Sequence, residues 1–340
     1  MSILFRRLLF LFVTVLLLLG ALSAGWLYLR KEADERLQLF IAQEAEKGRD
    51  WTCDRQSFDG YPFSLLMTCD RPQMVAAGND LVRLNLAQLR AEASVFTLGR
   101  MTVALVGPLE ARFTRDRLLT AEWRAFTIEL ARDHAVAAAD DVAARMMRFT
   151  AAPEENVRVQ RLLARVAPTA DRVPEAQAWD LNLEAGDVDW KGLHALTTNS
   201  DPVTLQIAGI VTGLASRIDQ PLPQALDAWR ASGGAVRLSN VRLTKGDLRA
   251  GLTGELRLDE QRRPAGDIEL WASSLEPLQP LLKTLKIGAN LTAMTALLRA
   301  VGGGAQRDEE QGRIRLPLGL SNGRVRVGPI ATPIRLTPLY

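Results

Sequence analysis

Hydrophobic and polar residues alternate with a period of two along most of this chain, which is typical of β-strands with one buried face. The longest alternation covers residues 248–258, after which residues 261–266 form a turn and Ile268 and Leu270 continue the pattern. One face of the first strand carries Leu248, Ala250, Leu252, Gly254, Leu256 and Leu258. We predict an antiparallel pair of strands that shares one apolar face.

The same alternation predicts further strands along the body of the chain. They cover residues 82–87, 101–106, 109–113, 119–130, 179–183 and 203–214. In the fourth of these, Phe126, Ile128 and Leu130 share one face. Gly107 and Pro108 predict a turn between the second and the third.

A second hairpin is predicted near the C-terminus. Asn322-Gly323 is typical of a two-residue hairpin loop. Such a loop pairs Leu320 with Val325 and Leu318 with Val327. All four side chains then lie on one face, in agreement with the hydrophobic pattern.

Helical spacing occurs in a few segments between the strands. We predict helices at residues 31–47, 133–148, 221–231, 275–285 and 291–300. Residues 150–176 contain Pro153, Pro168 and Pro174 and are predicted to link two halves. The expected organisation is a membrane anchor with a connecting helix (residues 1–50), a first β-rich half (51–160) and a second β-rich half (161–340).

One segment is long and apolar enough to cross a membrane. Leu8 to Leu29 contains no charged residue, and 22 residues of helix span ~33 Å against a hydrocarbon core of ~30 Å. Trp26 and Tyr28 lie at its end, where aromatic rings favour the membrane interface. A cleaved signal peptide, processed near Ala21-Leu22-Ser23, is the alternative. We favour an uncleaved anchor because signal-peptide cores usually have about 7–15 apolar residues.

The stretch between the anchor and the strands, residues 51–69, contains both cysteines of the chain. A hairpin that places Cys53 opposite Cys69 has its loop at residues 59–63 and its tip at Gly60, Tyr61, Pro62 and Phe63. Directly opposed residues lie within reach of a disulfide. We favour a disulfide, which requires an oxidising compartment, over two buried thiols. The register also predicts that Trp51, Cys53, Leu65, Met67 and Cys69 share an apolar face.

The excess of positive charge is local. The chain has 42 basic and 39 acidic residues. Arg6, Arg7, Arg30 and Lys31 flank the apolar segment, and without these four the chain has 38 basic against 39 acidic residues. We therefore expect no nucleic-acid partner, because such proteins carry a basic stripe.

Residues that carry chemistry are sparse. Neither His134 nor His194 has a metal-ligand partner at short spacing, and no nucleophile elbow, P-loop or dinucleotide-binding motif occurs. The acid pairs Asp187/Asp189 and Glu309/Glu310 are more typical of loops than of catalytic dyads. The Gly302–Gly304 run is more typical of the end of a helix than of a phosphate site. We expect no cofactor, no metal and no enzymatic activity.

The combination of an N-terminal anchor, Cys53, Gly60-Tyr61-Pro62-Phe63, Cys69 and residues 316–328 resembles an uncharacterised bacterial envelope family, domain of unknown function 2125. That family supplies no known activity and no functional residues. The block 246–277 also resembles strands of AsmA-type envelope proteins. This second similarity would imply a membrane-anchored periplasmic protein with a groove for lipid chains.

The sequence therefore predicts a mainly β protein of the α+β class. An N-terminal transmembrane helix precedes curved antiparallel sheets with a few short helices, arranged either as a closed sandwich-like core or as an open half-barrel. We expect a single-pass inner-membrane protein whose body lies in the periplasm and supports the cell envelope. In the open arrangement, lipid would bind a groove lined by Leu248, Leu252, Leu256, Ile268 and Leu270. The alternatives are a scaffold that binds an envelope protein, and a periplasmic hydrolase with a pocket near His134 or His194.

Overall fold

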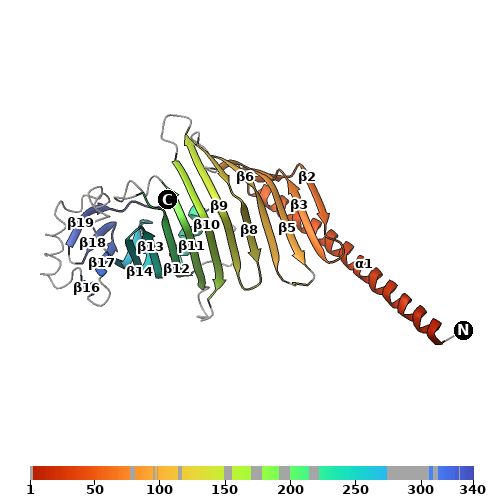
Figure 1. Ribbon diagram of the computed structural model, residues 1–340. Helices are drawn as coiled ribbons and strands as arrows, with labels where there is room; N and C mark the ends of the chain where they lie inside the picture. The colour runs from red at the N-terminus through yellow and green to blue at the C-terminus, as the bar shows by residue number, and fades with distance from the viewer. Residues whose placement is uncertain are drawn as a thin grey trace. The chain divides into compact units, whose positions relative to one another are not determined.

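The computed structural model is mostly antiparallel β-sheet with one long N-terminal helix, as predicted (Figure 1). It describes residues 3–76, 81–94, 96–97, 99–113, 117–148, 155–169, 178–190, 200–213, 222–273, 306–308, 313–328 and 330–340. The chain divides into two compact units, which are described separately. The first comprises residues 1–132 and 144–154, and the second comprises residues 133–143 and 155–340.

The first unit consists of α1 and a set of antiparallel strands. Their bounds are α1 Ile3–Glu46, β1 Arg49–Thr52, β2 Arg55–Asp59, β3 Ser64–Asp70, β4 Gln73–Ala76, β5 Leu81–Ser94, β6 Met101–Phe113, β7 Arg117–Glu122 and β8 Ala125–Leu130. The long strand β5 pairs with β3 and β4 on one side and with β6 on the other. The strand β9, Ala135–Arg148, contributes residues to both units.

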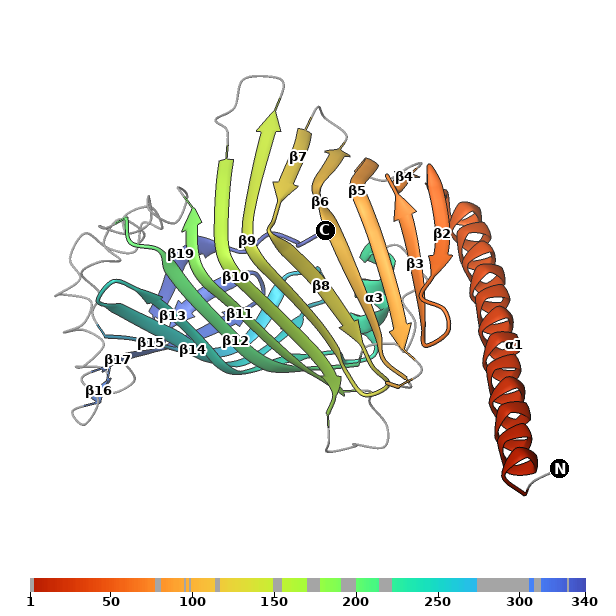
Figure 2. The ribbon, with the colours of Figure 1, turned by 45° about the vertical axis from the view of Figure 1, so that its right-hand side comes forward.

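The second unit is a series of paired strands with one short helix. Their bounds are β10 Glu155–Pro168, β11 Ala178–Trp190, β12 Val203–Thr212, α3 Leu222–Ala231, β13 Val236–Lys245, β14 Leu248–Leu258, β15 Pro264–Ala272, β16 Gln306–Asp308, β17 Arg313–Ser321, β18 Arg324–Val327 and β19 Ile330–Arg335. Neighbours pair in sequence from β10 to β15, and β15 then pairs with β17. Figure 2 shows that these strands form a strongly curved sheet.

Several predicted elements have the predicted bounds. Strand β14 covers residues 248–258, and α3 coincides with the helix predicted at 221–231. At the Asn322-Gly323 loop, Leu320 pairs with Val325 and Leu318 with Val327. Both loop residues have positive φ, 50° and 68°, as a hairpin turn of this length requires. Local turn chemistry and strand alternation therefore determine these elements.

The predicted turn at Gly107-Pro108 is wrong, because β6 runs through it. Leu86 pairs with Leu109 and Gln88 with Val106, so Gly107 and Pro108 together lie opposite the single residue Ala87. This is a β-bulge, where a proline is tolerated because the extra residue is outside the ladder. The segment 119–130 is also divided, into β7 and β8, with Trp123 and Arg124 between them.

The helix predicted at residues 133–148 is wrong as well, since β9 occupies this segment. Residues 155–168, predicted to lie in a linker, form β10. Alanine favours a helix over a strand by less than ~1 kcal/mol, and pairing with a neighbouring strand outweighs that preference. The helices predicted at 275–285 and 291–300 lie outside the described residues.

Glycine is required at positions where strands of the second unit approach closely. Gly254 has a φ of 149°, and a Cβ there would lie 2.3 Å from the backbone oxygen of Asp267. Its partner Ile268 lies on the same apolar face. The backbones of β14 and β15 therefore meet where no side chain can fit.

We predict that Gly254→Ala lowers the free energy of unfolding by about 1–3 kcal/mol, because it adds both a clash and backbone strain. Gly186→Ala is the control, since its nearest neighbour would lie at an ordinary 3.8 Å. Urea unfolding of the detergent-solubilised protein measures both variants. Equal losses of unfolding free energy in the two variants would contradict the special requirement for glycine at position 254.

Candidate functional site

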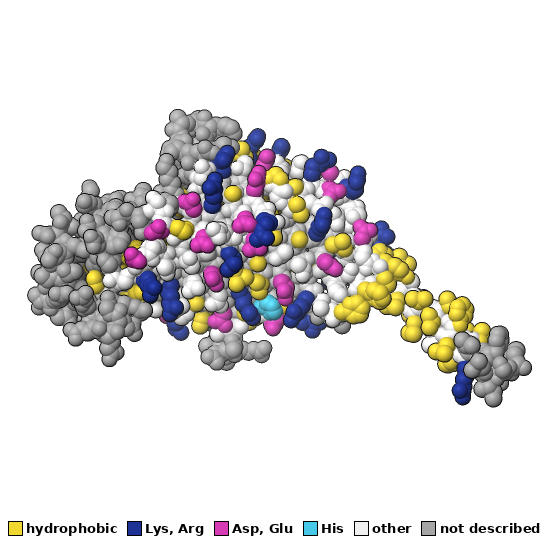
Figure 3. All heavy atoms as spheres, in the orientation of Figure 1, with side chains coloured by type: hydrophobic (Ala, Val, Ile, Leu, Met, Phe, Trp, Pro, Cys, Tyr) yellow, Lys and Arg dark blue, Asp and Glu magenta, His cyan; other side chains and the backbone are white. Residues whose placement is uncertain are grey.

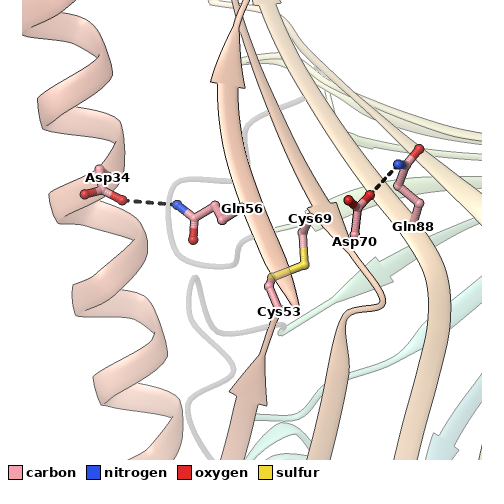
Figure 4. Close-up of a disulfide and its surroundings, with 6 residues drawn as sticks. All are labelled: Asp34, Cys53, Gln56, Cys69, Asp70 and Gln88. Atoms are coloured by element: carbon pink, nitrogen blue, oxygen red, sulfur yellow. Dashed lines mark hydrogen bonds between the residues drawn. A yellow bond between two sulfur atoms is a disulfide. The ribbon is translucent and has the colours of Figure 1, made fainter.

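A disulfide joins Cys53, which lies just before β2, to Cys69 in β3, as predicted (Figure 4). The two Cα atoms are 5.6 Å apart, and the structure contains no free cysteine. Cys69 is 2% exposed, whereas Cys53 is exposed, so the bond runs from the surface into the packed part of the first unit. The bond ties the segment that leaves the N-terminal helix to the body of the sheet.

The predicted register of the hairpin is wrong by three residues. Cys69 lies opposite Gln56, and Phe58 lies opposite Met67. The prediction placed Cys53 and Cys69 directly opposite each other in the two strands. In the structure, Cys53 precedes β2 and reaches Cys69 from outside the paired residues. Because the shift is odd, Phe58 joins the face of Leu65, Met67 and Cys69. Trp51 instead pairs with Met74 of β4.

The hairpin tip comprises Gly60, Tyr61, Pro62 and Phe63, as predicted. Gly60 has a φ of 93°, and a Cβ there would lie 2.7 Å from the carbonyl oxygen of Ser64. The Ser64 amide donates a hydrogen bond to the Gly60 carbonyl at 2.8 Å, which closes the loop. Tyr61 and Phe63 are exposed.

The tip contacts the apolar part of α1. The hydroxyls of Tyr61 and Ser23 are 2.6 Å apart, and the Trp26 indole N–H donates to the Ser64 carbonyl at 2.8 Å. The Trp26 and Tyr61 rings pack edge to face with centroids 5.6 Å apart. Trp26 is 9% exposed because it packs on the hairpin, whereas Tyr28 is exposed.

Polar contacts continue along the same helix. The Gln56 amide donates to Asp34 at 3.1 Å (Figure 4), and the Arg49 guanidinium donates to Glu44 at 2.5 and 2.8 Å. Glu44 is buried, and the hydrogen bonds from Arg49 lower its pKa to about 2. Gly48, with a φ of 74°, turns the chain from α1 into β1. The strands of the first unit therefore contact α1 at several points along the length of the helix.

The second unit carries one continuous apolar face. Four rows of directly paired residues cross from β10 to β17 or β18, and each position in them is apolar or glycine. The rows are Leu162–Ala185–Leu205–Leu243–Ala250–Ala272–Ile314, Ala164–Leu183–Ile207–Val241–Leu252–Leu270–Leu316, Val166–Leu181–Gly209–Leu238–Gly254–Ile268–Leu318–Val327, and Pro168–Trp179–Val211–Val236–Leu256–Gly266–Leu320–Val325. These four rows are called the apolar face below.

A β-bulge keeps this face continuous. In β13, Leu238 pairs with Gly254 and Val241 with Leu252, so two residues of β13 lie opposite Thr253. The bulge allows Leu238 and Val241, three positions apart, to point to the same side. The sequence pattern breaks at this point, and only the pairing shows that the two halves of the strand share a face.

Most side chains of the apolar face are only half-buried. The predicted groove residues all lie on this side of the sheet: Leu248 is 2% exposed, and Leu252, Leu256, Ile268 and Leu270 are half-buried. A small core forms around Ala272, Leu316 and Val327. The opposite side is more polar. Its neighbouring row includes Glu184, Gln206, Arg242 and Arg315 together with Leu163 and Trp271. The apolar face is therefore only partly buried, apart from this small core.

A buried cation lies at one end of this face. Lys245 is 1% exposed and pairs with Val203 and Leu248, both also buried. Its ammonium donates to the backbone carbonyl of Asp201. The sequence pattern does not indicate that Lys245 is buried. Only the register shows that it lies on the apolar side of the sheet.

A second polar cluster joins α3 to the β14–β15 turn and the C-terminus. Asp227 accepts hydrogen bonds from Arg262 at 2.7 and 3.0 Å and from the Tyr340 hydroxyl at 3.0 Å. Arg262 holds the pKa of Asp227 below its ordinary value, and burial raises the pKa of Tyr340. This cluster could not be predicted from the sequence, since its members are far apart in the chain.

The histidines and acid pairs form no common site in the described residues. His134 contacts its neighbour Asp133 at 2.8 Å, and His194 lies outside the described residues. Asp187 has a φ of 51° next to the bulge of β11, whereas Glu309, Glu310 and Gly302–Gly304 are not described. Within the described ranges, no group of three or more His, Cys, Asp and Glu side chains could hold a metal ion.

Comparison with known proteins gives one match. A family model described as "Uncharacterized protein conserved in bacteria (DUF2125)" matches residues 26–334. No curated protein and no solved structure matches the chain. The comparisons therefore give no support for the expected similarity to AsmA-type proteins.

We predict that both cysteines resist alkylation in denaturant without reductant and that both react once reductant is added. Denaturant is needed because Cys69 is buried and would be protected even as a free thiol. Loss of the bond in a Cys53→Ser/Cys69→Ser variant should lower the free energy of unfolding by about 3 kcal/mol, from loop closure. Mass spectrometry counts the modified thiols, and alkylation of either cysteine before reduction would contradict the disulfide.

We predict that Glu44→Gln destabilises the protein by about 1.5 kcal/mol at pH 7, because it removes charge-assisted hydrogen bonds. The folded pKa of Glu44, about 2, lies below the ordinary 4.5. Its contribution is therefore complete above pH 4.5 and is lost as the pH falls toward 2. Urea unfolding should show the two proteins converging over that window. Glu46→Gln, an exposed position on the same helical turn, is the control and should change little.

Proposed function

Because this chain belongs to the bacterial DUF2125 family, whose members are uncharacterised, we propose a function from its own geometry. The protein is held in the inner membrane by α1, and its body lies in the periplasm. The apolar face of the second unit binds the acyl chains of lipids, and this binding supports the cell envelope. The protein acts as a binding protein rather than as an enzyme.

The location is supported by two independent features. Residues 9–46 belong to one helix that is long and apolar enough to cross a membrane, and its apolar side chains are largely exposed. Hydrocarbon is the environment in which such a surface is stable. The Cys53–Cys69 disulfide favours an oxidising compartment, which is on the far side of the inner membrane.

The proposal that the ligand is a lipid rests mainly on the apolar face. From β10 to β18 the face crosses seven strand pairings, or ~34 Å at ~4.8 Å per pairing. One leaflet of the hydrocarbon core is ~15 Å thick, so the face is longer than one acyl chain. A large apolar face that is not fully buried can gain free energy by burying further area against an apolar ligand.

We predict that lipid crosslinks to the apolar face and not to the other side of the same strand. A photoreactive benzoylphenylalanine at Leu252 faces the rows, whereas the same residue at the exposed neighbour Thr253 faces the polar side. After irradiation in cells, mass spectrometry of the purified protein should find lipid adducts at position 252 at least tenfold above position 253.

Native mass spectrometry of Leu252→Gln gives a second measurement. The variant should retain its fold, judged by circular dichroism, and lose most co-purifying lipid, while Thr253→Gln retains it. Equal lipid at both positions would contradict the proposal. Crosslinking of position 252 to one protein, without lipid, would instead establish the scaffold function.

A further inference from the structure

We propose that one edge of the first unit enters the headgroup layer of the bilayer beside α1. This edge comprises Tyr61, Phe63, Phe96, Met101 and Leu130 and is called the apolar edge below. The proposal rests on the membrane anchor of the proposed function, but not on lipid binding by the second unit. Its partner is the bilayer surface itself.

The pairing of strands brings these five residues to the same end of the sheet. Ser64 at the start of β3 pairs with Ser94 at the end of β5, and Met101 at the start of β6 pairs with Leu130 at the end of β8. The tip of the β2–β3 hairpin and the loop after β5 therefore project from the same end. The Phe63 and Phe96 rings lie 5.4 Å apart and join the two loops.

The side chains of the apolar edge are exposed. The exposed fractions are 56% for Tyr61, 49% for Phe63, 75% for Phe96, 38% for Met101 and 37% for Leu130. Among the described residues outside α1, the exposed aromatic side chains are those of Tyr61, Phe63 and Phe96, so all three lie on this one edge. Figure 3 shows hydrophobic side chains gathered where the body meets α1.

The contacts with α1 fix the height of the edge relative to the anchor. Tyr61 contacts Ser23 and Trp26, which precede Arg30, the first charged residue after the apolar segment, by seven and four positions. At ~1.5 Å per residue, the tip lies about 6–10 Å below the level of Arg30. That depth corresponds to the headgroups and the upper acyl chains of the outer leaflet.

A second contact shows that the hairpin lies along the helix. Gln56 contacts Asp34, eleven residues after Ser23, which is ~16 Å of helix. Gln56 and Tyr61 are five residues apart, which is ~17 Å of strand. The two lengths agree, so the hairpin runs beside α1 with its tip toward the apolar segment (Figure 1).

The chemistry of the edge suits a bilayer interface. Tyrosine and phenylalanine rings combine with exposed aliphatic side chains there, and aromatic residues favour the headgroup level. Arg30, which lies 5.8 Å from the Trp26 ring, supplies a cation at the level of lipid phosphates, and Lys31 beside it is exposed and pairs with Glu35 at 3.6 Å. The edge and the anchor therefore form one continuous membrane-binding surface, which would fix the orientation of the first unit above the bilayer.

The test measures how deep single fluorophores, attached at chosen positions, lie in the bilayer. Because the native cysteines form a disulfide, an introduced cysteine is the only free thiol. Phe96→Cys and Met101→Cys probe the edge, and Leu17→Cys probes the middle of the apolar segment. Val82→Cys is the control, since Val82 is exposed and apolar but lies at the other end of β5, ~40 Å away. Each variant is labelled with NBD and reconstituted in phosphatidylethanolamine–phosphatidylglycerol vesicles.

Lipids with a nitroxide near the headgroup should quench labels at 96 and 101 at least threefold more than the label at 82. Aqueous iodide should quench the label at 82 several-fold more than the labels at 96 and 101. Iodide quenching of positions 96 and 101 equal to that of 82, with position 17 quenched by lipid, would overturn the apolar edge and leave the anchor intact. Iodide quenching of position 17 would overturn the anchor, and the edge proposal with it.

Discussion

The register between neighbouring strands is the constraint on which the structure depends. A strand exposes alternate side chains on opposite sides, so a slip of one residue would move every apolar side chain of that strand to the polar side. In the second unit, the pairings from β10 to β18 keep four rows free of polar side chains. Bulges and close-packed glycines maintain this alignment where the sequence alternation breaks.

The same constraint gives the second unit two chemically distinct sides. Most side chains of the apolar face are half-buried, and the small core around Leu316 involves only a few of them. An apolar ligand would bury more of this face and would stabilise the sheet. This is why the geometry supports a binding function more directly than it supports a reaction.

In the first unit, the strands are held to the N-terminal helix by contacts at several positions along it. Contacts at Ser23, Trp26, Asp34 and Glu44 follow α1 from its apolar segment to its C-terminal end, and the disulfide holds the contacting hairpin to the sheet. Contacts at several heights resist rotation better than a single hinge would. A helix held in this way can orient a body above a membrane as well as tether it.

Four features could be predicted from the sequence, because each depends on local periodicity or on a few neighbouring residues. They are the β-rich class, the apolar N-terminal helix, the Cys53–Cys69 pair and the hairpin at Asn322-Gly323. Prediction failed at Gly107-Pro108 and at residues 133–148, where pairing with distant strands overrides local preference. Three features depend on how distant segments pack: the hairpin register at Gln56, the contact of Tyr61 with Ser23 and the burial of Lys245. The physical reason is that alternation assigns side chains to a face, whereas only the pairing of distant strands decides which faces join and which residues meet.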